Sequence, residues 1–269
     1  MSNYCRTQTG RVFDSGLGEG SAEIVSYDES VNRAFVVNSE AGTIDVLQMT
    51  ATGSLPDGSA SYTIDVKAAY PGIALGNANS VAAMNGIVAV AIENANKQEN
   101  SVVAFYSSSD YQLLNAVEVD ALPDMVIFTP DGKQVVVANE GEPSSNYRVD
   151  PEGSISVIDI DRRHQVRSPV EHTIRFTDFN VGGSRHNELP DTVRIFGPDA
   201  TVAQDLEPEY VAVSENSRKA WVSLQENNAI AIIDLKKKTI NKIVSLGFKQ
   251  HDLEGNGLDG SDKDDQINI

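Results

Sequence analysis

The sequence has few of the residues that build several common kinds of site. Cys5 is the single cysteine among 269 residues, which excludes an intrachain disulfide, a cysteine-type zinc site and a CxxC redox motif. No apolar run approaches the ~18 residues that a membrane span needs. The first residues, MSNYCRTQTGRVF, include no apolar core, so we expect no signal peptide in this chain.

Positive charge is also scarce. There are 21 Lys and Arg residues against 39 Asp and Glu residues, which gives a formal net charge of −18. Nucleic acid requires clustered Lys and Arg, so this balance argues against nucleic acid and against anionic membrane surfaces. We therefore expect cations or basic proteins as partners.

Familiar catalytic motifs are missing from the sequence. It contains no HExxH, no GxSxG and no P-loop, and GLGEG at 16–20 precedes a predicted strand rather than a helix. A dinucleotide site is therefore not expected, and no catalytic residue is assigned.

What the sequence does contain is a repeated pattern of short strands. Runs rich in Val, Ile, Ala and Phe, bounded by Gly, Asn, Asp or Pro, fall into a four-strand unit that occurs four times. Such units predict an all-β protein, a β-propeller with four-stranded antiparallel blades. A stack of β-sandwiches is the alternative.

The predicted propeller is one domain or fragment over 1–269. We expect Val25, Val81, Val126 and Val211 to occupy equivalent places in the first strands, and Trp221 to pack between blades. Residues 176–207 are expected to form a long surface excursion. The predicted blades cover about 22–66, 79–119, 124–176 and 208–246, followed by an acidic segment at 247–269.

An acidic face is predicted where first strands begin and second strands end, because these ends are neighbours in an antiparallel sheet. The first strands start at Glu23, Asn79, Asp124 and Glu209, and the second strands end at Glu40, Glu93, Glu140 and Glu226. Seven of these eight positions, which we take as equivalent among blades, are carboxylates, and Glu142 and Asp150 are candidates to complete a site. Oxygen ligands of this kind suit Ca²⁺, or Mg²⁺ with retained waters, better than zinc or copper. The alternative is a solvated acidic rim.

A second, weaker metal candidate lies in the C-terminal DGSDKDDQINI. Asp259, Asp262 and Asp264 are close together there, with Ser261 and Asp265. The spacing is similar to a calcium loop but lacks the glycine and the final glutamate in register. A solvated acidic loop is the alternative.

Several long stretches resemble the choice-of-anchor I family, which includes proteins similar to mesenchyme-specific cell-surface glycoproteins. The resemblance extends from about Thr9 to Ile269. It rests on LPDMVIFTPDGKQVVVANEGEP (122–143), VDPEGSISVIDI (149–160), RIFGPDATVAQDLEPEYVAVS (194–214), WVSLQENNAIAIIDL (221–235) and LGFKQHDLEGNGLDGSDKDDQINI at the end.

The resemblance implies an exported propeller of YncE-like or seven-bladed type, held at the cell surface by a C-terminal anchor and often labelled alkaline phosphatase. The chain resembles roughly the N-terminal half of these relatives. We therefore expect an incomplete ring of about four blades, extracellular or at the cell surface, whose open edges pair with another chain.

The leading functional hypothesis is a non-enzymatic propeller that binds divalent cations, or a protein partner, through its acidic face. The alternative is a calcium-dependent phosphoesterase, in which bound metals polarise a phosphoryl oxygen and activate water. A phosphate site also needs cationic or imidazole groups. Because the predicted face offers mainly carboxylates, the sequence favours binding.

Overall fold

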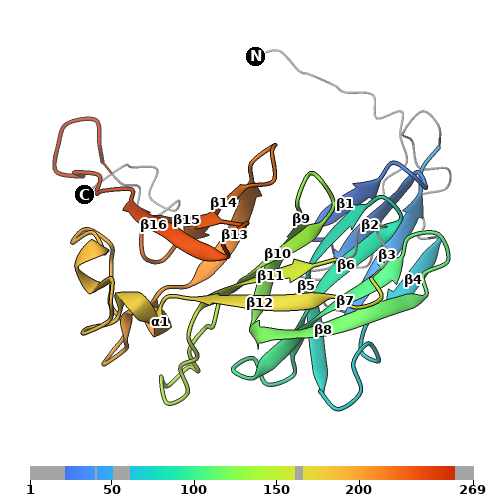
Figure 1. Ribbon diagram of the computed structural model, residues 1–269, viewed down its shortest axis with the longest axis horizontal. Coiled ribbons are helices and arrows are strands. Elements are labelled where there is room, and N and C mark those ends of the chain that lie inside the picture. The colour runs from blue at the N-terminus through green and yellow to red at the C-terminus, as the bar shows by residue number, and fades with distance from the viewer. Residues whose placement is uncertain (1–21, 40, 51–60, 161–165, 258–269) are drawn as a thin grey trace.

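The computed structural model describes residues 22–39, 41–50, 61–160 and 166–257, and these form four four-stranded antiparallel sheets in chain order (Figure 1). The first sheet holds β1 (Val25–Asp28), β2 (Arg33–Asn38), β3 (Thr43–Gln48) and β4 (Tyr62–Asp65). The second holds β5 (Leu75–Met84), β6 (Ile87–Asn94), β7 (Asn100–Ser107) and β8 (Leu113–Ala121). The third holds β9 (Pro123–Phe128), β10 (Gln134–Asn139), β11 (Ser154–Asp159) and β12 (Val170–Arg175). The fourth holds β13 (Pro208–Val213), β14 (Lys219–Leu224), β15 (Ala229–Asp234) and β16 (Thr239–Ser245).

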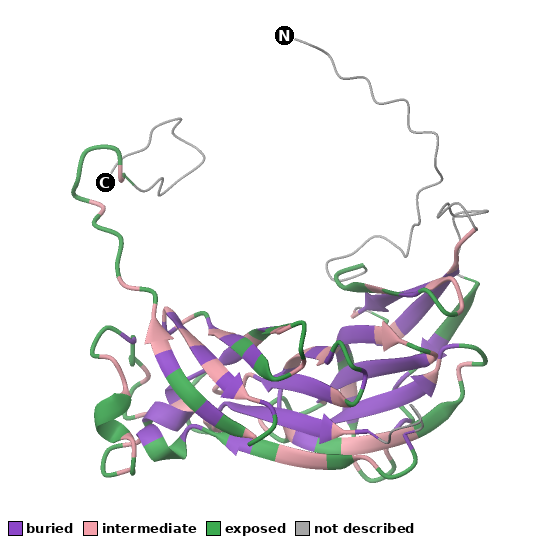
Figure 2. Ribbon diagram, turned by 45° about the horizontal axis from the view of Figure 1, so that its top comes forward, coloured by how far each residue is buried: buried purple, intermediate pink, exposed green. Residues whose placement is uncertain are grey.

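The sheets stack face to face with their first strands innermost. β5 contacts both β1 and β9, and β9 contacts β13, so the four first strands lie side by side. Figure 2 shows the sheets as a curved row with the buried segments inside it. This arrangement confirms the predicted all-β class and its propeller-type blades.

The strand register confirms that the four repeats are equivalent in their first strands. Each of the predicted valines lies opposite another valine on the second strand of its own sheet. The pairs are Val25 with Val36, Val81 with Val90, Val126 with Val137 and Val211 with Val222.

The same register shows that the second-strand glutamates are not all equivalent. Glu93 and Glu140 follow their paired valines by three residues, whereas Gln225 has that place in the fourth sheet and Glu226 comes one residue later. In the first sheet Ser39 has that place, three residues after Val36, and Glu40 comes one residue later along the sequence. The predicted equivalence of the four strand ends is therefore wrong for the first and fourth sheets. The shift is not visible in the sequence, because a glutamate stands near the end of each second strand. Within a strand, a shift of one residue would move a side chain to the opposite face of the sheet.

Aliphatic side chains fill the space between consecutive sheets. Val37 and Val46 meet Val81 and Val90 between the first two sheets, where all four are at most 3% exposed. A second cluster joins sheets two and three, and a third joins sheets three and four. Full burial of such a side chain contributes about 1.5–3 kcal/mol.

Residues 176–207 add a layer to the last junction. They include η1 (Thr177–Phe179), η2 (His186–Glu188) and α1 (Val202–Asp205), whose N-terminus has a capping box. Phe176, Phe179, Ala203 and Leu206 are buried in the core that sheets three and four share. These buried side chains anchor the segment to the core, while most residues from 177 to 201 stay partly or fully exposed.

Trp221 also departs from expectation. It lies on the outward face of the fourth sheet, opposite Ala212 on β13 and Ile232 on β15, and its side chain is 39% exposed. No described sheet covers this face, so Trp221 does not pack between described blades. Among the described residues, no helix is long and apolar enough to cross a membrane.

Candidate functional site

Carboxylates gather at one end of the inner strands of sheets three and four. Asp124 and Glu209 lie near the starts of β9 and β13, and Glu140 and Glu226 follow β10 and β14. Because β9 also contacts β13, the two sheets place these ends together. We call Asp124, Glu140, Glu142, Asp150, Glu207, Glu209 and Glu226 the acidic cluster.

Glu140 is the most perturbed carboxyl of the acidic cluster. Burial raises its pKa, and the negative charges of Asp124, Glu142, Glu209 and Glu207 raise it further, to about 8. Its backbone N–H donates to the carbonyl of Leu122 at 2.8 Å, which fixes the turn that carries it. A carboxyl in this environment resists ionisation because both burial and like charge disfavour the anion.

Glu207 and Glu209 flank Pro208 and show the same effect. Burial and then the charge of Glu226 raise the pKa of each to about 7. Glu207 is only 8% exposed, and a hydrogen bond between the Glu209 and Glu226 carboxyls also favours the protonated form of Glu209. The carboxylates of the acidic cluster therefore repel one another in a partly buried environment, where water screens their charges poorly.

Two carboxylate oxygens of the acidic cluster have no donor. Glu226 Oε2 and Asp150 Oδ1 are buried without a hydrogen-bond partner among the described residues. Asp205, beside them, contrasts with this, because its oxygens accept from the backbone N–H groups of Phe196 at 2.7 Å and Gly197 at 2.6 Å. Buried anionic oxygens without donors are costly unless protons or cations reach them.

The edge of the acidic cluster nearest the second sheet is partly neutralised. Burial and the charge of Glu23 raise the pKa of Asp124, while the charge of Lys97 opposes this rise. Lys97 Nζ also lies 3.7 Å from Glu93 Oε2, and Glu93 Oε1 accepts from the Asn77 N–H at 3.4 Å. Glu93 is thus satisfied locally.

The structure therefore brings together Asp124, Glu140, Glu209 and Glu226, joined by Glu142 and Asp150. Glu23 is exposed at the border, and Glu93 pairs with Lys97. Glu40 and the tail candidates Asp259, Asp262 and Asp264 lie outside the described residues. No three described His, Cys, Asp or Glu side chains are placed, as they stand, to hold a metal ion.

Sequence reasoning missed Glu207. The predicted strand began at Glu209, two residues after Glu207, and a period of two places side chains on one face of an extended segment. That spacing is the signal that identifies Glu207.

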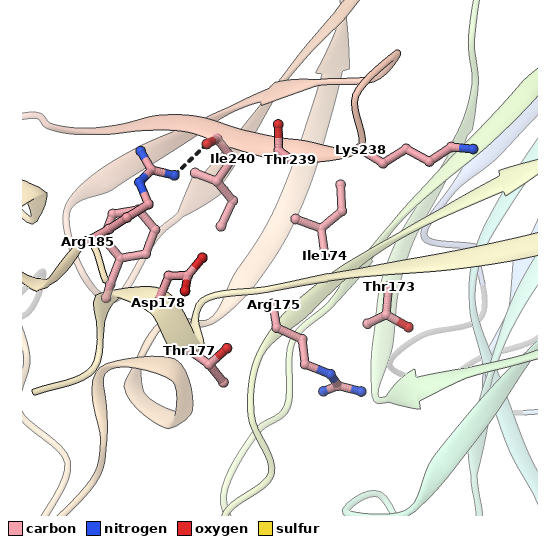
Figure 3. Close-up of a pocket in the computed structure, with 10 residues that line it drawn as sticks. Thr173, Ile174, Arg175, Thr177, Asp178, Arg185, Lys238, Thr239 and Ile240 are labelled. Carbon is pink, nitrogen blue, oxygen red and sulfur yellow. Dashed lines mark hydrogen bonds between the residues drawn. The ribbon is translucent and has the colours of Figure 1, made fainter. Parts of the chain in front are cut away.

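A different hollow, of about 560 Å³, lies between β12 and β16 and is lined by three basic residues (Figure 3). In Figure 3, Arg185 turns toward the carbonyl of Ile240, while the charged ends of Lys238 and Arg175 point away from it. All three are already paired, Arg175 with Asp120 and Glu152, Arg185 with Glu188, and Lys238 with Asp159. Their charges are therefore neutralised within the protein, so the hollow is a poor binding site for an anion.

Comparison with known proteins identifies the relatives of this chain. A family model described as the choice-of-anchor I domain matches residues 23–269. No curated protein matches the sequence.

Solved structures with a similar fold include the following two. The β-propeller domain of Cps50 (Swd1) from Myceliophteria thermophila is 10% identical with a TM-score of 0.51, and 86% of this chain covers 58% of that one. A functionally unknown protein from Desulfotomaculum acetoxidans is 13% identical with a TM-score of 0.52, with 85% and 58% covered. The chain thus spans 58% of each of these structures, and the likeness concerns the fold alone.

Proposed function

This chain belongs to the choice-of-anchor I family, and we propose that it is a binding propeller whose acidic cluster takes a divalent, oxygen-preferring cation, Ca²⁺ in the first place. The family description suggests a surface-associated protein. The observation that carries the proposal is the buried Glu226 Oε2, which accepts no hydrogen bond from the part of the chain that the structure describes and lies among other carboxylates.

The donor set supports a hard cation. Every member of the acidic cluster offers carboxylate oxygens, which Ca²⁺ binds six to eight at a time in flexible geometry. Mg²⁺ demands a tighter octahedron, and zinc prefers nitrogen and sulfur ligands that the cluster lacks. Small rotations of Glu140, Glu207 and Glu226 are required, since the side chains do not yet converge on one point.

The electrostatics support a cation in the same way. A divalent ion would relieve the repulsion that raises the pKa values of Glu140, Glu207 and Glu209. Because protons compete for the same oxygens, binding should tighten as pH rises through about 7 to 8.

The test is calcium binding by the whole chain, measured by calorimetry and by melting temperature in Ca²⁺ and in EDTA at constant ionic strength. A ligand at a hundredfold excess over Kd that binds only the folded state adds about 2.7 kcal/mol. We expect this gain in wild type, a much smaller gain in Glu207→Gln, and no change in the control Glu215→Gln, which alters an exposed acid in the turn between β13 and β14. Equal melting temperatures in both buffers, with no heat of binding, would show that the cluster is only a solvated acidic rim.

A further inference from the structure

A hollow of about 300 Å³ lies between the outer strand β4 of the first sheet and the turn that joins β7 to β8 in the second. Its lining includes Tyr62, Asp65, Tyr106, Tyr111 and Gln112. We propose that this hollow binds a neutral pyranose unit of a carbohydrate, with the ring of Tyr62 as the stacking platform.

The platform is a stacked aromatic pair. The rings of Tyr62 and Tyr111 lie 4.4 Å apart between centroids with an interplanar angle of 17°. Tyr62 is nevertheless 50% exposed, so the stack leaves ring surface open to solvent. The face of an aromatic ring is negatively polarised and attracts the positively polarised C–H groups that a pyranose presents on one side.

The backbone of Tyr111 is held in a strained conformation that fixes the position of its ring. Tyr111 has φ of 64°, a left-handed conformation that a bulky side chain avoids by roughly 1–2 kcal/mol. The turn holds it by two hydrogen bonds of 2.9 Å, from the N–H of Tyr111 to the carbonyl of Ser107 and from the N–H of Ser107 to the carbonyl of Gln112. A platform fixed in advance loses little entropy when a ligand binds.

Arg33 stiffens the pair from the first sheet. Its guanidinium carbon lies 5.0 Å from the centroid of the Tyr111 ring, and its Nη1 donates to the carbonyls of Ser108 and Ser109 at 2.7 Å. Nε donates to Gln48 Oε1 at 2.9 Å. The Arg33 guanidinium therefore already occupies a face of the Tyr111 ring. The ring surface that remains open to a ligand is that of Tyr62.

The polar lining suits hydroxyl groups. The Tyr106 hydroxyl is buried without a hydrogen-bond partner among the described residues, and burial together with the charge of Asp65 raises the pKa of Tyr106, so the group stays neutral. Asp65 accepts from the N–H of Lys67 and keeps further acceptor capacity, and Gln112 offers both donor and acceptor. The carboxylate of Asp65 and the net charge of −18 disfavour acidic sugars.

The fold itself does not require these aromatic residues. The corresponding turn of the fourth sheet holds Lys238, with φ of 56° and a hydrogen bond of 2.7 Å from its N–H to the carbonyl of Asp234. There Lys238 pairs with Asp159 at 2.6 Å. The stack of Tyr62 on Tyr111 is thus a local specialisation of the first junction.

The experiment titrates the whole chain, in EDTA, with methyl glycosides of glucose, galactose, mannose and N-acetylglucosamine, followed by calorimetry and saturation-transfer NMR. EDTA separates this test from that of the acidic cluster, which needs a cation. We expect saturable millimolar binding of at least one glycoside. Tyr62→Ala should weaken it about 3- to 10-fold, the range of an aromatic contact.

Two variants control for the hydroxyl and for aromatic exposure in general. Tyr62→Phe keeps the platform and should bind within about twofold of wild type. Tyr210→Ala removes a 62% exposed tyrosine of the fourth sheet and should change nothing. The proposal is overturned if no glycoside binds, if Tyr62→Ala binds as well as wild type, or if choline binds through Tyr62 while the glycosides do not.

Discussion

The outward face of the fourth sheet differs from the same face of the first three sheets. The residue just before the paired valine on the second strand is Phe35, Ala89, Val136 or Trp221 in turn. The first three are fully buried because the next sheet covers them, whereas Trp221, the largest of the four, is 39% exposed. The burial of this position therefore depends on a neighbouring sheet and not on the hydrophobicity of the residue itself.

The largest effect that tests this comparison comes from truncating the same position in two sheets. Phe35→Ala should lower the free energy of unfolding by about 3–5 kcal/mol, because it removes a buried ring and leaves a cavity between the first two sheets. Trp221→Ala should cost less than about 1 kcal/mol, as expected for a partly exposed side chain. Urea denaturation followed by circular dichroism measures both. Similar losses in the two variants would refute the comparison.

Glu93 and Glu140 provide a second matched pair, since both lie three residues after the paired valine. In EDTA, Glu140 has a folded pKa of about 8, above its unfolded value, so the folded state binds the proton more tightly. Stability should therefore fall as pH rises from about 4.5 to about 8.

Glu140→Gln should remove much of this pH dependence and raise stability near pH 8.5 by about 2 kcal/mol, with no gain near pH 4. The gain is smaller than the full pKa shift would give, because the neighbouring carboxylates share the repulsion. Glu93→Gln is the control and should give no gain, because Lys97 lies 3.7 Å from that carboxylate. Parallel pH profiles for wild type and Glu140→Gln, measured by urea denaturation, would contradict the electrostatic account.

The repeats were predictable from sequence because strand pairing imposes a local pattern. A valine on the first strand, a turn and a valine on the second strand recur in all four units, and the register confirms each pair. The meeting of Asp124 with Glu209 was predictable for the same reason, since both lie two residues before their valines. These features depend on contacts within one sheet or between equivalent strands.

The remainder depends on contacts that no repeat contains. Whether Trp221 is covered depends on another sheet, and the burial of Phe179 depends on how residues 176–207 fold back onto sheets three and four. Glu226 belongs to the acidic cluster although it lies one residue beyond the place that Glu140 occupies, because it follows the end of β14, where strict alternation no longer applies. Sequence spacing does not carry this information.

The smallest effect concerns the equivalent turns that hold Tyr111 and Lys238. The pair of Lys238 Nζ and Asp159 Oδ2, 2.6 Å apart, is partly exposed, so Lys238→Met should cost only about 0.5–1 kcal/mol. Burial raises the pKa of Asp159, but hydrogen bonds from Lys238 and Gln134 and the charge of Lys238 outweigh it and lower the pKa overall. The contribution of the pair is therefore present at neutral pH and lost as pH falls through the folded pKa.

Salt separates this ionic turn from the aromatic one. Raising NaCl from about 50 mM to about 500 mM shortens the Debye length and should reduce the difference between wild type and Lys238→Met, although a partly buried pair in direct contact is screened less than an exposed one. Tyr111→Asn loses the stack on Tyr62 and the contact with the Arg33 guanidinium, but it relieves the left-handed strain, which asparagine tolerates, so its net effect should stay within about 1 kcal/mol. That difference should depend on salt less than the difference for Lys238→Met, because no charge is removed. The account would be wrong if the loss of stability in Lys238→Met did not depend on salt. It would also be wrong if the loss in Tyr111→Asn depended on salt as strongly as the loss in Lys238→Met.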